Sequence, residues 1–423
     1  MLREIWIIAI VFLIACSPRE QQPATVAPNA WQTALEDEVT RLDVESEGSL
    51  GVYVQRLDDG SEFHHASDKK WYLASTTKVL VAIVALQHVD SGELSLEHRV
   101  TLKGSDHVDG GGTLRFRPPG TRISVRTLLE QMLTYSDSTA ADLLIKLVGE
   151  RELNRQLATF AEAGSFGRIT SLLQVRYDAY SMLHTRAREL TNQDFIRLKS
   201  VPISGRLQAF MNRLNLSRSD LGASSIEAAF ERYYETGRNS GTLSGFGRVL
   251  AALWKGELLS SGGTALLLRF MERMRTGEHR IKAGLPTGLK FAQKTGTQSG
   301  RVCNVGIVRE TAPEPPRRKP RGVVVAACVA DFSRPAAAEA VLQKLGRAVG
   351  ALFVREAAVA RVDRSWNKLC FLERDGYCIA SSPDNSSRLQ QALPYFQEDK
   401  RRGKRAFRAQ GVACASGGKS YPY

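Results

Sequence analysis

Ser75-Thr76-Thr77-Lys78 opens an apolar run over residues 79–86, and the rest of the chain is organised around this stretch. The run continues to Val89 and stops at Asp90-Ser91-Gly92, a length and an ending that favour a helix over a buried strand. In a helix, Ser75 lies at the N-terminus and Lys78 lies one turn further along the same face. A lysine in a dry site can take the proton of a serine hydroxyl, and free N–H groups at a helix start can stabilise an oxyanion. By itself the pattern more often marks the start of a surface helix, whereas further motifs beside it would indicate a nucleophilic serine.

Length and composition are those of an ordinary globular protein, with 423 residues of which 43% are hydrophobic and 24% are charged. This length allows a large core and two or three domains. The formal net charge is +14. No basic face interleaved with aromatic residues stands out, so we expect no nucleic-acid partner. We interpret the basic clusters at residues 317–321 and 400–405 as a solvated loop and a solvated tail.

The N-terminus carries a targeting signal. An apolar run from Ile5 to Ala15 is too short to span a bilayer as a mature helix. It ends in Leu13-Ile14-Ala15-Cys16, which resembles the lipobox of bacterial lipoproteins, where the cysteine is lipidated after cleavage. We expect residues 1–15 to be the signal peptide, Cys16 the lipid anchor to the membrane, and residues 16–29 a tether in the periplasm-facing cell envelope. A plain secretory signal is the alternative, and either one places the fold where disulfides are allowed.

Hydrophobic periodicity predicts strands near both chain ends and helices between and outside them. We therefore expect an α+β fold in residues 30–356, with an antiparallel sheet built from both chain ends, flanking helices and an inserted all-helical lobe at about 92–286. Residues 357–423 form a basic tail to which we assign no function. The expected strands are 51–57, 61–65, 288–297, 302–309 and 322–330, and the expected helices include 31–44, 124–133, 139–148, 186–199, 206–214, 226–234, 244–254, 263–274 and 335–353.

The cysteines show no zinc-ligand spacing. Cys303 and Cys328 fall opposite each other if their strands pair as a simple hairpin. Because a disulfide between directly paired strand positions is strained, we expect two unbridged core thiols, with a disulfide as the alternative.

Three short motifs follow one another along the chain: Ser75-x-x-Lys78, then Ser136-Asp137-Ser138 on a turn between helices, then Lys294-Thr295-Gly296-Thr297 on a strand. Together they resemble the serine β-lactamase and penicillin-binding protein superfamily, and they are most similar to class A β-lactamases. The resemblance covers roughly residues 31–353. It implies the β-lactamase/transpeptidase-like fold, no cofactor and no metal; we also expect a monomer.

The resemblance also implies a role for each residue. Ser75 would be the acylated nucleophile, Lys78 would take its proton, Ser136 would pass a proton to the leaving nitrogen, and Lys294 would hold Ser136 and attract the substrate carboxylate. Ser138, Thr295, Gly296 and Thr297 would bind substrate, and the backbone N–H groups of Ser75 and Thr297 would form the oxyanion hole. Two neighbouring ammonium groups lower each other's pKa, which favours a neutral lysine as the base.

Two departures from the class A pattern concern substrate binding and deacylation. The second motif usually ends in asparagine, whereas here it ends in Ser138, whose shorter side chain reaches a substrate amide less well. The glutamate that activates the deacylating water has no clear counterpart. Arg238-Asn239-Ser240 looks similar to the end of the family's loop, and counting back from it suggests Glu227 or Glu231. Both glutamates also fit the polar side of an amphipathic helix, and we favour that interpretation.

Three functions fit these observations. The first is a serine β-lactamase that hydrolyses the β-lactam amide through an acyl-serine intermediate. The second is a D-Ala-D-Ala peptidase or another acyl hydrolase of the same fold that β-lactams inhibit, because an acyl-enzyme without a placed glutamate should persist. The third is a non-catalytic envelope-binding module, which would have no need of Ser75, Lys78 and Lys294 together. The sequence favours the first, with a small β-lactam or a peptidoglycan-like peptide as substrate.

Overall fold

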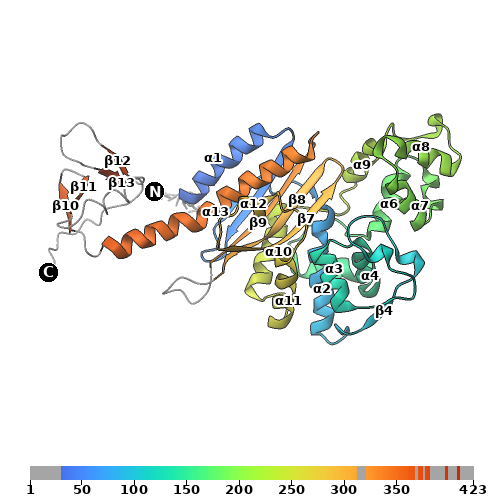
Figure 1. Cartoon of the computed structure of the whole chain (residues 1–423), viewed down its shortest axis with the longest axis horizontal. Helices are drawn as coiled ribbons and strands as arrows, with labels where there is room; N and C mark the ends of the chain where they lie inside the picture. Colours follow the sequence, from blue (N-terminus) through green and yellow to red (C-terminus); the bar gives the residue numbers. More distant parts are fainter. Residues whose placement is uncertain are drawn as a thin grey trace, which may run out of the picture.

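A five-stranded antiparallel sheet lies at the centre of the molecule, in the order β2-β1-β9-β8-β7 (Figure 1). The computed structural model describes residues 30–311 and 321–366 and four short strand segments, 370–374, 377–381, 396–398 and 407–409. The chain's first part supplies β1 (Ser49–Arg56) and β2 (Glu62–His65), and its later part supplies β7 (Leu289–Gln298), β8 (Arg301–Glu310) and β9 (Gly322–Ala330). The predicted α+β fold, with an antiparallel sheet built from both chain ends, is confirmed.

One face of the sheet is covered by α1 (Ala30–Glu45) and α13 (Pro335–Trp366), which lie along it in Figure 1. Leu35 and Val39 of α1 share an apolar core with Leu342 and Leu345 of α13 and with the valines of β1 and β9. The short helix α12 (Ile281–Gly284) joins this layer through Ile281. α13 continues past residue 353, where we predicted its end.

The other face packs against α10 (Leu243–Lys255), α11 (Ser261–Glu272) and α2 (Lys78–Asp90). Every residue of α2 from Lys78 to Leu86 is buried. A helix that is apolar on all sides belongs in the interior, between the sheet and the helical lobe. This burial explains why its sequence lacks an amphipathic pattern and could also have been taken for a strand.

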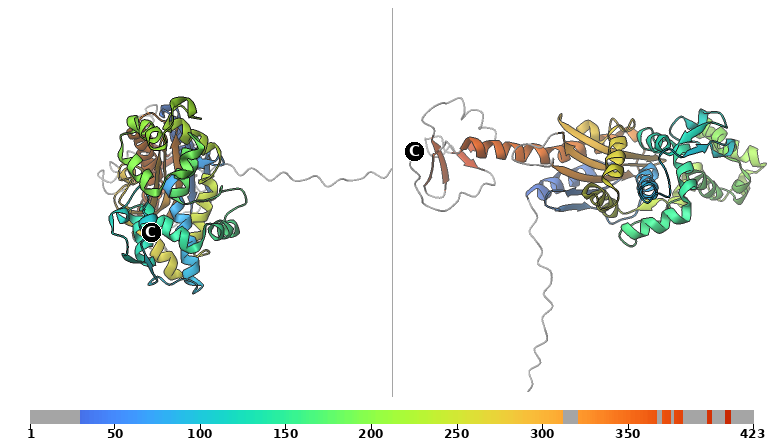
Figure 2. Two further views of the ribbon diagram at one scale, coloured as in Figure 1. Left: turned by 90° about the vertical axis from the view of Figure 1, so that its right-hand side faces the viewer. Right: turned by 90° about the horizontal axis from the view of Figure 1, so that it is seen from below.

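The helical lobe lies at the end of the molecule opposite the C-terminal segments (Figure 2). Its later helices, α6 to α9, enclose an aromatic core of their own that includes Phe195, Phe210, Phe230 and Tyr233. The predicted helix over 186–199 is wrong, because Thr191 caps a new helix and divides it into η4 and α7. The helices of the lobe are α3 (Val125–Thr134), α4 (Ser138–Val148), α5 (Glu150–Phe160), α6 (Leu172–Ser181), η4 (Thr185–Glu189), α7 (Asn192–Ser200), α8 (Ile203–Leu214) and α9 (Ile226–Glu235). Two short pairs of strands accompany them: β3 (Trp71–Tyr72) pairs with β6 (Ser240–Gly241), and β4 (Arg99–Thr101) pairs with β5 (Arg122–Ser124).

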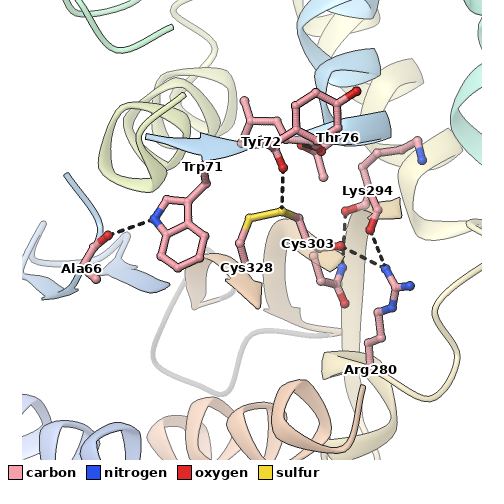
Figure 3. Close-up of a disulfide and its surroundings, with 11 residues drawn as sticks. Ala66, Trp71, Tyr72, Thr76, Arg280, Lys294, Cys303 and Cys328 are labelled. Carbon is pink, nitrogen blue, oxygen red and sulfur yellow. Dashed lines mark hydrogen bonds between the residues drawn. A yellow bond between two sulfur atoms is a disulfide. The ribbon is translucent and has the colours of Figure 1, made fainter. Parts of the chain in front are cut away.

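Cys303 and Cys328 form a disulfide, so our expectation of two free thiols was wrong (Figure 3). The two residues pair directly between β8 and β9 with a Cα–Cα distance of 4.1 Å. That is close to the separation of a non-hydrogen-bonded antiparallel pair, where side chains approach most closely. The bond links the two strands behind β3, where Cys303 Sγ lies 3.6 Å from the carbonyl oxygen of Tyr72.

The chain beyond residue 366 contains two strand pairs, β10 (Cys370–Arg374) with β11 (Tyr377–Ser381) and β12 (Phe396–Glu398) with β13 (Phe407–Ala409), where the sequence predicted no regular structure. The signal peptide, Cys16 and the tether lie outside the described residues. None of the helices within the described part is both long and apolar enough to cross a membrane.

Candidate active site

Ser75 lies in a tight turn, η1 (Ala74–Thr77), between β3 and α2. Ala74 has a φ of 47°, a left-handed conformation that is strained for a residue with a side chain. The hydroxyls of Thr76 and Thr77 donate to the carbonyl oxygens of Leu73 and Ala74, at 2.8 and 2.9 Å, and hold the turn. Ser75 itself is partly exposed, and its hydroxyl makes no hydrogen bond to another described residue. The turn thus presents a free hydroxyl to solvent.

Lys78 follows on the first turn of α2 and is only 5% exposed. Its Nζ donates to the carbonyl oxygen of Ser136 at 2.5 Å and lies 3.3 Å from Ser138 Oγ and 3.4 Å from Ser136 Oγ. Burial lowers the pKa of Lys78 to about 8, an effect that the carboxylates of Asp137 and Asp142 partly oppose. A substantial fraction of this amine is therefore neutral near pH 8 and able to accept a proton.

The Ser136-Asp137-Ser138 turn joins α3 to α4. Ser136 has a φ of 57°, the second strained non-glycine residue of the site. Asp137 caps α4, since its carboxylate accepts the N–H of Ala140 at 2.9 Å, and it also accepts the N–H of Leu114 at 2.8 Å. These bonds fix the turn so that both serine hydroxyls face Lys78.

Lys294 reaches the same turn from the sheet. Its Nζ donates to Ser136 Oγ at 2.9 Å and to the carbonyl oxygen of Thr295 at 2.9 Å, and its side chain is fully buried. Burial, and then the positive charges of Lys78 and Arg280, lower its pKa well below the ordinary value. Two amines, one from α2 and one from β7, therefore meet at the Ser136 hydroxyl.

Gly296 brings β7 against the Ser75 turn. A Cβ at this position would lie 2.4 Å from the carbonyl oxygen of Leu73, so only glycine allows the contact. β7 is an edge strand, which leaves alternate backbone groups free to pair with a bound substrate. Thr297 is exposed beside this edge. Its predicted part in an oxyanion hole with Ser75 stays a prediction.

Sequence reasoning missed Arg280, which is 4% exposed and lies behind the third motif (Figure 3). Its guanidinium donates to Thr297 Oγ1 at 2.7 Å and to the carbonyl oxygens of Gly296 and Cys303 at 3.0 and 3.1 Å, while Glu339 accepts from Nε at 3.0 Å. It adds a third cation where a substrate carboxylate is expected. No local pattern distinguishes this arginine from the others in the chain.

The glycine-rich segment 110–112 also belongs to the site, although the sequence indicated only a loop. A Cβ on Gly110, whose φ is 119°, would lie 2.6 Å from Ser138 Oγ and 3.0 Å from Leu172 Cδ2. A Cβ on Gly111 would lie 2.8 Å from the carbonyl oxygen of Ser136. The run of glycines lets this loop lie directly on the second motif, with Leu172 as its neighbour.

The two glutamates suggested as deacylation bases do not join this cluster. Glu231 pairs with Arg301 at the start of β8, and Glu227 is exposed on α9. The segment that does face the second motif is the start of α6. Asp142 holds it there, because its carboxylate accepts the N–H groups of Leu172 and Leu173 at 2.7 and 3.0 Å. Burial raises the pKa of Asp142 to about 6.

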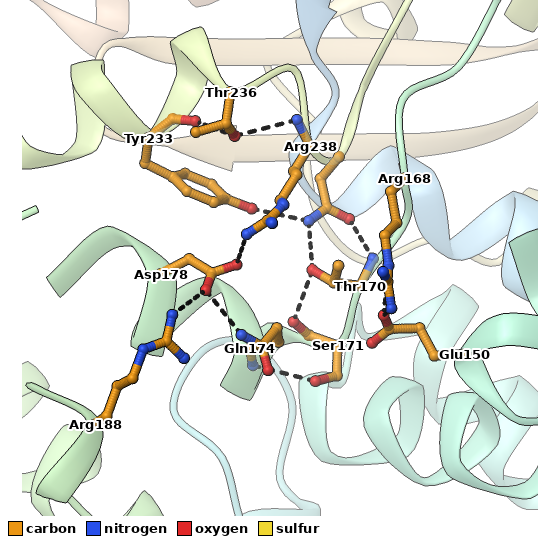
Figure 4. Close-up of polar contacts among 11 residues, drawn as sticks. Glu150, Arg168, Thr170, Ser171, Gln174, Asp178, Arg188, Tyr233, Thr236 and Arg238 are labelled. Atoms are coloured by element: carbon orange, nitrogen blue, oxygen red, sulfur yellow. Dashed lines mark hydrogen bonds and ion pairs between the residues drawn. The ribbon is translucent and has the colours of Figure 1, made fainter. Parts of the chain in front are cut away.

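A polar network fixes α6 against the loop that ends at residue 240 (Figure 4). Asp178 on α6 accepts from Arg238 at 2.6 Å, and Thr170 exchanges hydrogen bonds with the Asn239 side chain at 2.8 and 3.0 Å. Tyr233 accepts a further bond from Asn239 at 3.0 Å. The Arg238-Asn239-Ser240 segment therefore holds the start of α6 in place. It does not bring α9 next to Lys78, Ser136 and Lys294.

Comparisons with known proteins agree with this geometry. A family model described as "Beta-lactamase enzyme family" matches residues 34–353. A β-lactamase of Bacillus licheniformis is 22% identical over 300 residues, which are 70% of this chain and 79% of that protein. Beta-lactamase 3 of Bacillus cereus is 24% identical over 281 residues, 66% of this chain and 69% of that protein.

Solved structures share the fold. PBP-A has a TM-score of 0.55 at 21% identity, covering 76% of this chain and 97% of its own. A leucine-to-glutamate mutant of PBP-A, in an acyl-enzyme complex with penicillin G, has a TM-score of 0.55 at 20% identity, with the same coverage of 76% and 97%. A β-lactamase from Xanthomonas campestris pv. campestris has a TM-score of 0.56 at 21% identity, covering 76% of this chain and 98% of its own. The family match spans most of the chain, so this protein belongs to the beta-lactamase enzyme family, within the serine β-lactamase and penicillin-binding protein superfamily.

Proposed function

We propose that this protein is a penicillin-binding serine acyl hydrolase, in which Ser75 is acylated by β-lactams or by the penultimate D-Ala carbonyl of a D-Ala-D-Ala peptide. The observation that carries the proposal is the meeting of two buried amines at one hydroxyl, that of Ser136. Lys294 Nζ lies 2.9 Å from Ser136 Oγ and Lys78 Nζ lies 3.4 Å from it. A binding module would gain nothing from burying two unpaired cations.

The reaction uses these groups in sequence. Neutral Lys78 takes the Ser75 proton as Oγ attacks the substrate carbonyl, and the resulting oxyanion is stabilised by backbone N–H groups of Ser75 and Thr297. The proton then passes through Ser136 Oγ to the amide nitrogen, whose C–N bond breaks and leaves the acyl-serine ester. Lys294, Thr295 and Arg280 bind the substrate carboxylate, since they concentrate positive charge and donors at that end of the cleft.

The rate of deacylation distinguishes the hydrolase proposed here from an efficient β-lactamase. Hydrolysis of the ester needs a base for water, and the carboxylates near the cluster are engaged: Asp137 caps α4, and Asp142 holds the start of α6. The α6 side chain that shares the surroundings of Gly110 with Ser138 is apolar, because Ser138 Oγ and Leu172 Cδ2 would lie 2.6 and 3.0 Å from a Cβ on that glycine. We therefore propose slow deacylation of the penicilloyl enzyme, with Lys78 as the remaining base. β-Lactamase activity is the second candidate, favoured by the names of the curated relatives.

Intact mass spectrometry after brief exposure to benzylpenicillin, followed over time, tests the proposal. We expect a mass increase of one penicilloyl group on Ser75 that persists for minutes or longer, and no increase in Ser75→Ala. Rapid loss of the adduct with catalytic hydrolysis of a chromogenic cephalosporin would favour the β-lactamase instead. A protein that acquires no adduct from any β-lactam would reject the acyl-serine mechanism.

A further inference from the structure

A cavity of about 220 Å³ lies where the helical lobe meets the end of β7. Arg176, Lys199 and Arg206 line it together with Asp109, and Gln298 and Ser299 form its side toward β7. The helices that supply these cations, α6, α7 and α8, lie in the stretch between Gly149 and Arg238. The cavity therefore belongs to the later part of the helical lobe.

The charges of this cavity do not cancel. Arg176 and Asp109 form a buried pair, with both carboxylate oxygens 2.9 Å from Nε, so they neutralise each other. Arg206 donates to the carbonyl oxygens of Leu198 and Val201 at 3.0 and 3.1 Å. Among the described residues, neither Arg206 nor Lys199 has a carboxylate partner, and the Lys199 ammonium makes no hydrogen bond. The positive charges of both side chains thus lack a carboxylate partner in the described ranges, and the Lys199 ammonium is free to donate to an anion.

The walls of the cavity are apolar and aromatic. Phe195 and Phe230 are both buried, and each packs against the ring of Tyr180, with centroids 5.4 and 6.3 Å apart. Ile203 lies at the rim and is 51% exposed. An apolar wall beside unpaired cations suits a carboxylate carried on a hydrocarbon stem.

The position of the cavity along β7 sets which part of a substrate can reach it. Thr295 and Arg280 mark the end that binds the leaving-group carboxylate, and the reacting carbonyl lies near Thr297. Gln298, the last residue of β7, and Ser299, in the turn that follows it, come next along the chain and line the cavity. Because a strand advances about 3.3 Å per residue, the end of β7 at Gln298 lies roughly 3 Å beyond Thr297, and the chain continues from there on the acyl side of the reacting carbonyl.

We infer that this cavity binds a carboxylate on the acyl side of the substrate, so that the enzyme prefers acyl donors with an acidic side chain. The inference rests on the proposed acyl-serine function. It names a substrate class, which is a peptide or β-lactam whose acyl group carries a carboxylate on a short stem. Burial lowers the pKa of Lys199, and so do the charges of Arg176 and Arg206, an effect that the carboxylate of Asp109 partly opposes and that a bound anion would offset further.

Two cephalosporins that differ only in the acyl side chain test this inference. One carries a glutaryl group and the other a pentanoyl group, so the first has a terminal carboxylate where the second has a methyl group. We expect the glutaryl compound to acylate Ser75 about tenfold faster, as a charge-assisted contact would allow, and we expect high salt to shrink this ratio. Lys199→Gln should reduce the ratio several-fold, and Lys199→Glu should bring it below one. Arg197→Gln removes a charge on the same helix from a side chain that is 78% exposed, and it should leave the ratio unchanged.

Equal acylation rates in the unaltered protein, or a ratio that Lys199→Glu does not change, would overturn the inference while leaving the acyl-serine proposal intact. If neither cephalosporin acylates Ser75, the proposed function fails instead. Thermal unfolding of each variant shows whether the fold is retained, and the salt dependence of the unaltered protein decides the question even if a variant does not fold.

Discussion

Lys78 and Lys294 place two amines in the interior with few carboxylates to balance their charge. Lys78 is 5% exposed and Lys294 is fully buried, and the nearest carboxylates, Asp137 and Asp142, are occupied by backbone N–H groups. Burying an ammonium ion disfavours its charged form, so the folded protein holds these protons less tightly than the unfolded chain does. The site thereby obtains a proton acceptor from a residue that is normally protonated at neutral pH.

The first prediction concerns the pH dependence of acylation. Lys78 acts as a base only when deprotonated, and its pKa is lowered to about 8, so the acylation rate should rise roughly tenfold per pH unit below that value and level off above it. Rapid mixing with benzylpenicillin between about pH 6 and 9, with the adduct quantified by mass, measures the profile. A rate that stays flat across this range would argue against Lys78 as the base.

The second prediction concerns Arg280. Arg280→Lys keeps one charge but loses the fork that reaches Thr297, Gly296 and Cys303 together, so acylation by carboxylate-bearing β-lactams should slow by about tenfold. The exposed Arg275→Lys is the matched control and should have no effect. If Arg280→Lys acylates at the unaltered rate while remaining folded, Arg280 has no part in substrate binding.

At the scale of elements, the start of α6 decides the environment of the acyl-enzyme. Asp142 accepts hydrogen bonds from the backbone of Leu172 and Leu173, and Arg238 donates to Asp178, which lies further along the same helix. These contacts place an apolar side chain beside Ser138, where a class A enzyme would need a carboxylate near the ester. The helices α7 and α8, which follow α6, leave this anchor in place and supply Lys199 and Arg206 to the cationic cavity.

The third prediction follows from this position. Leu172→Glu should speed deacylation of the penicilloyl enzyme by at least about tenfold, because a carboxylate beside Ser138 can activate water. Leu172→Gln has a similar shape without the charge and should not. Adduct lifetimes measured by mass spectrometry compare the two, and equal lifetimes would show that Leu172 does not face the ester.

The fourth prediction concerns the bond between β8 and β9. Cys303 and Cys328 are 25 residues apart, so their disulfide restricts the unfolded chain and should contribute about 3 kcal/mol to the free energy of unfolding. Thermal unfolding with and without reductant measures this contribution. The double variant Cys303→Ala and Cys328→Ala should unfold at a lower temperature and no longer respond to reductant. A protein equally stable in both conditions would show that the thiols are free.

At the scale of the whole molecule, the site forms only when both chain ends have joined the sheet. Ser75 follows a segment from the first part of the chain, Lys294 lies on a strand from its last part, and Ser136 comes from the lobe inserted between them. Contacts of such long sequence separation depend on complete folding, so binding of a β-lactam also reports on the integrity of the fold.

The fifth prediction concerns location. We propose that Cys16 carries a lipid and tethers the domain to the membrane, as the lipobox-like segment indicates. In a bacterial host, Cys16→Ser should move penicillin-labelled protein from the membrane fraction to the soluble periplasmic fraction. Equal membrane content of both proteins would show that Cys16 is not the anchor.

The sequence by itself determined the three motifs, their order and the α+β arrangement, because periodicity, caps and turn residues are local signals. Ser124, which caps α3, and the helix α2, which follows the Ser75 turn, illustrate this, since their structures follow from a few neighbouring residues. The family match agrees with the motifs as well.

Only the tertiary structure decided the positions of Arg280, of Leu172 beside Ser138, of the glycine loop on the second motif and of the Cys303–Cys328 bond. Counting along the chain suggested Glu227 and Glu231, but the structure places Leu172 beside the second motif instead, because the loop that ends at Arg238 is fixed by its contact with Asp178. The physical reason is the same in each case. These neighbours are set by packing and hydrogen bonds between segments far apart in the chain, and such contacts leave no periodic pattern in the sequence.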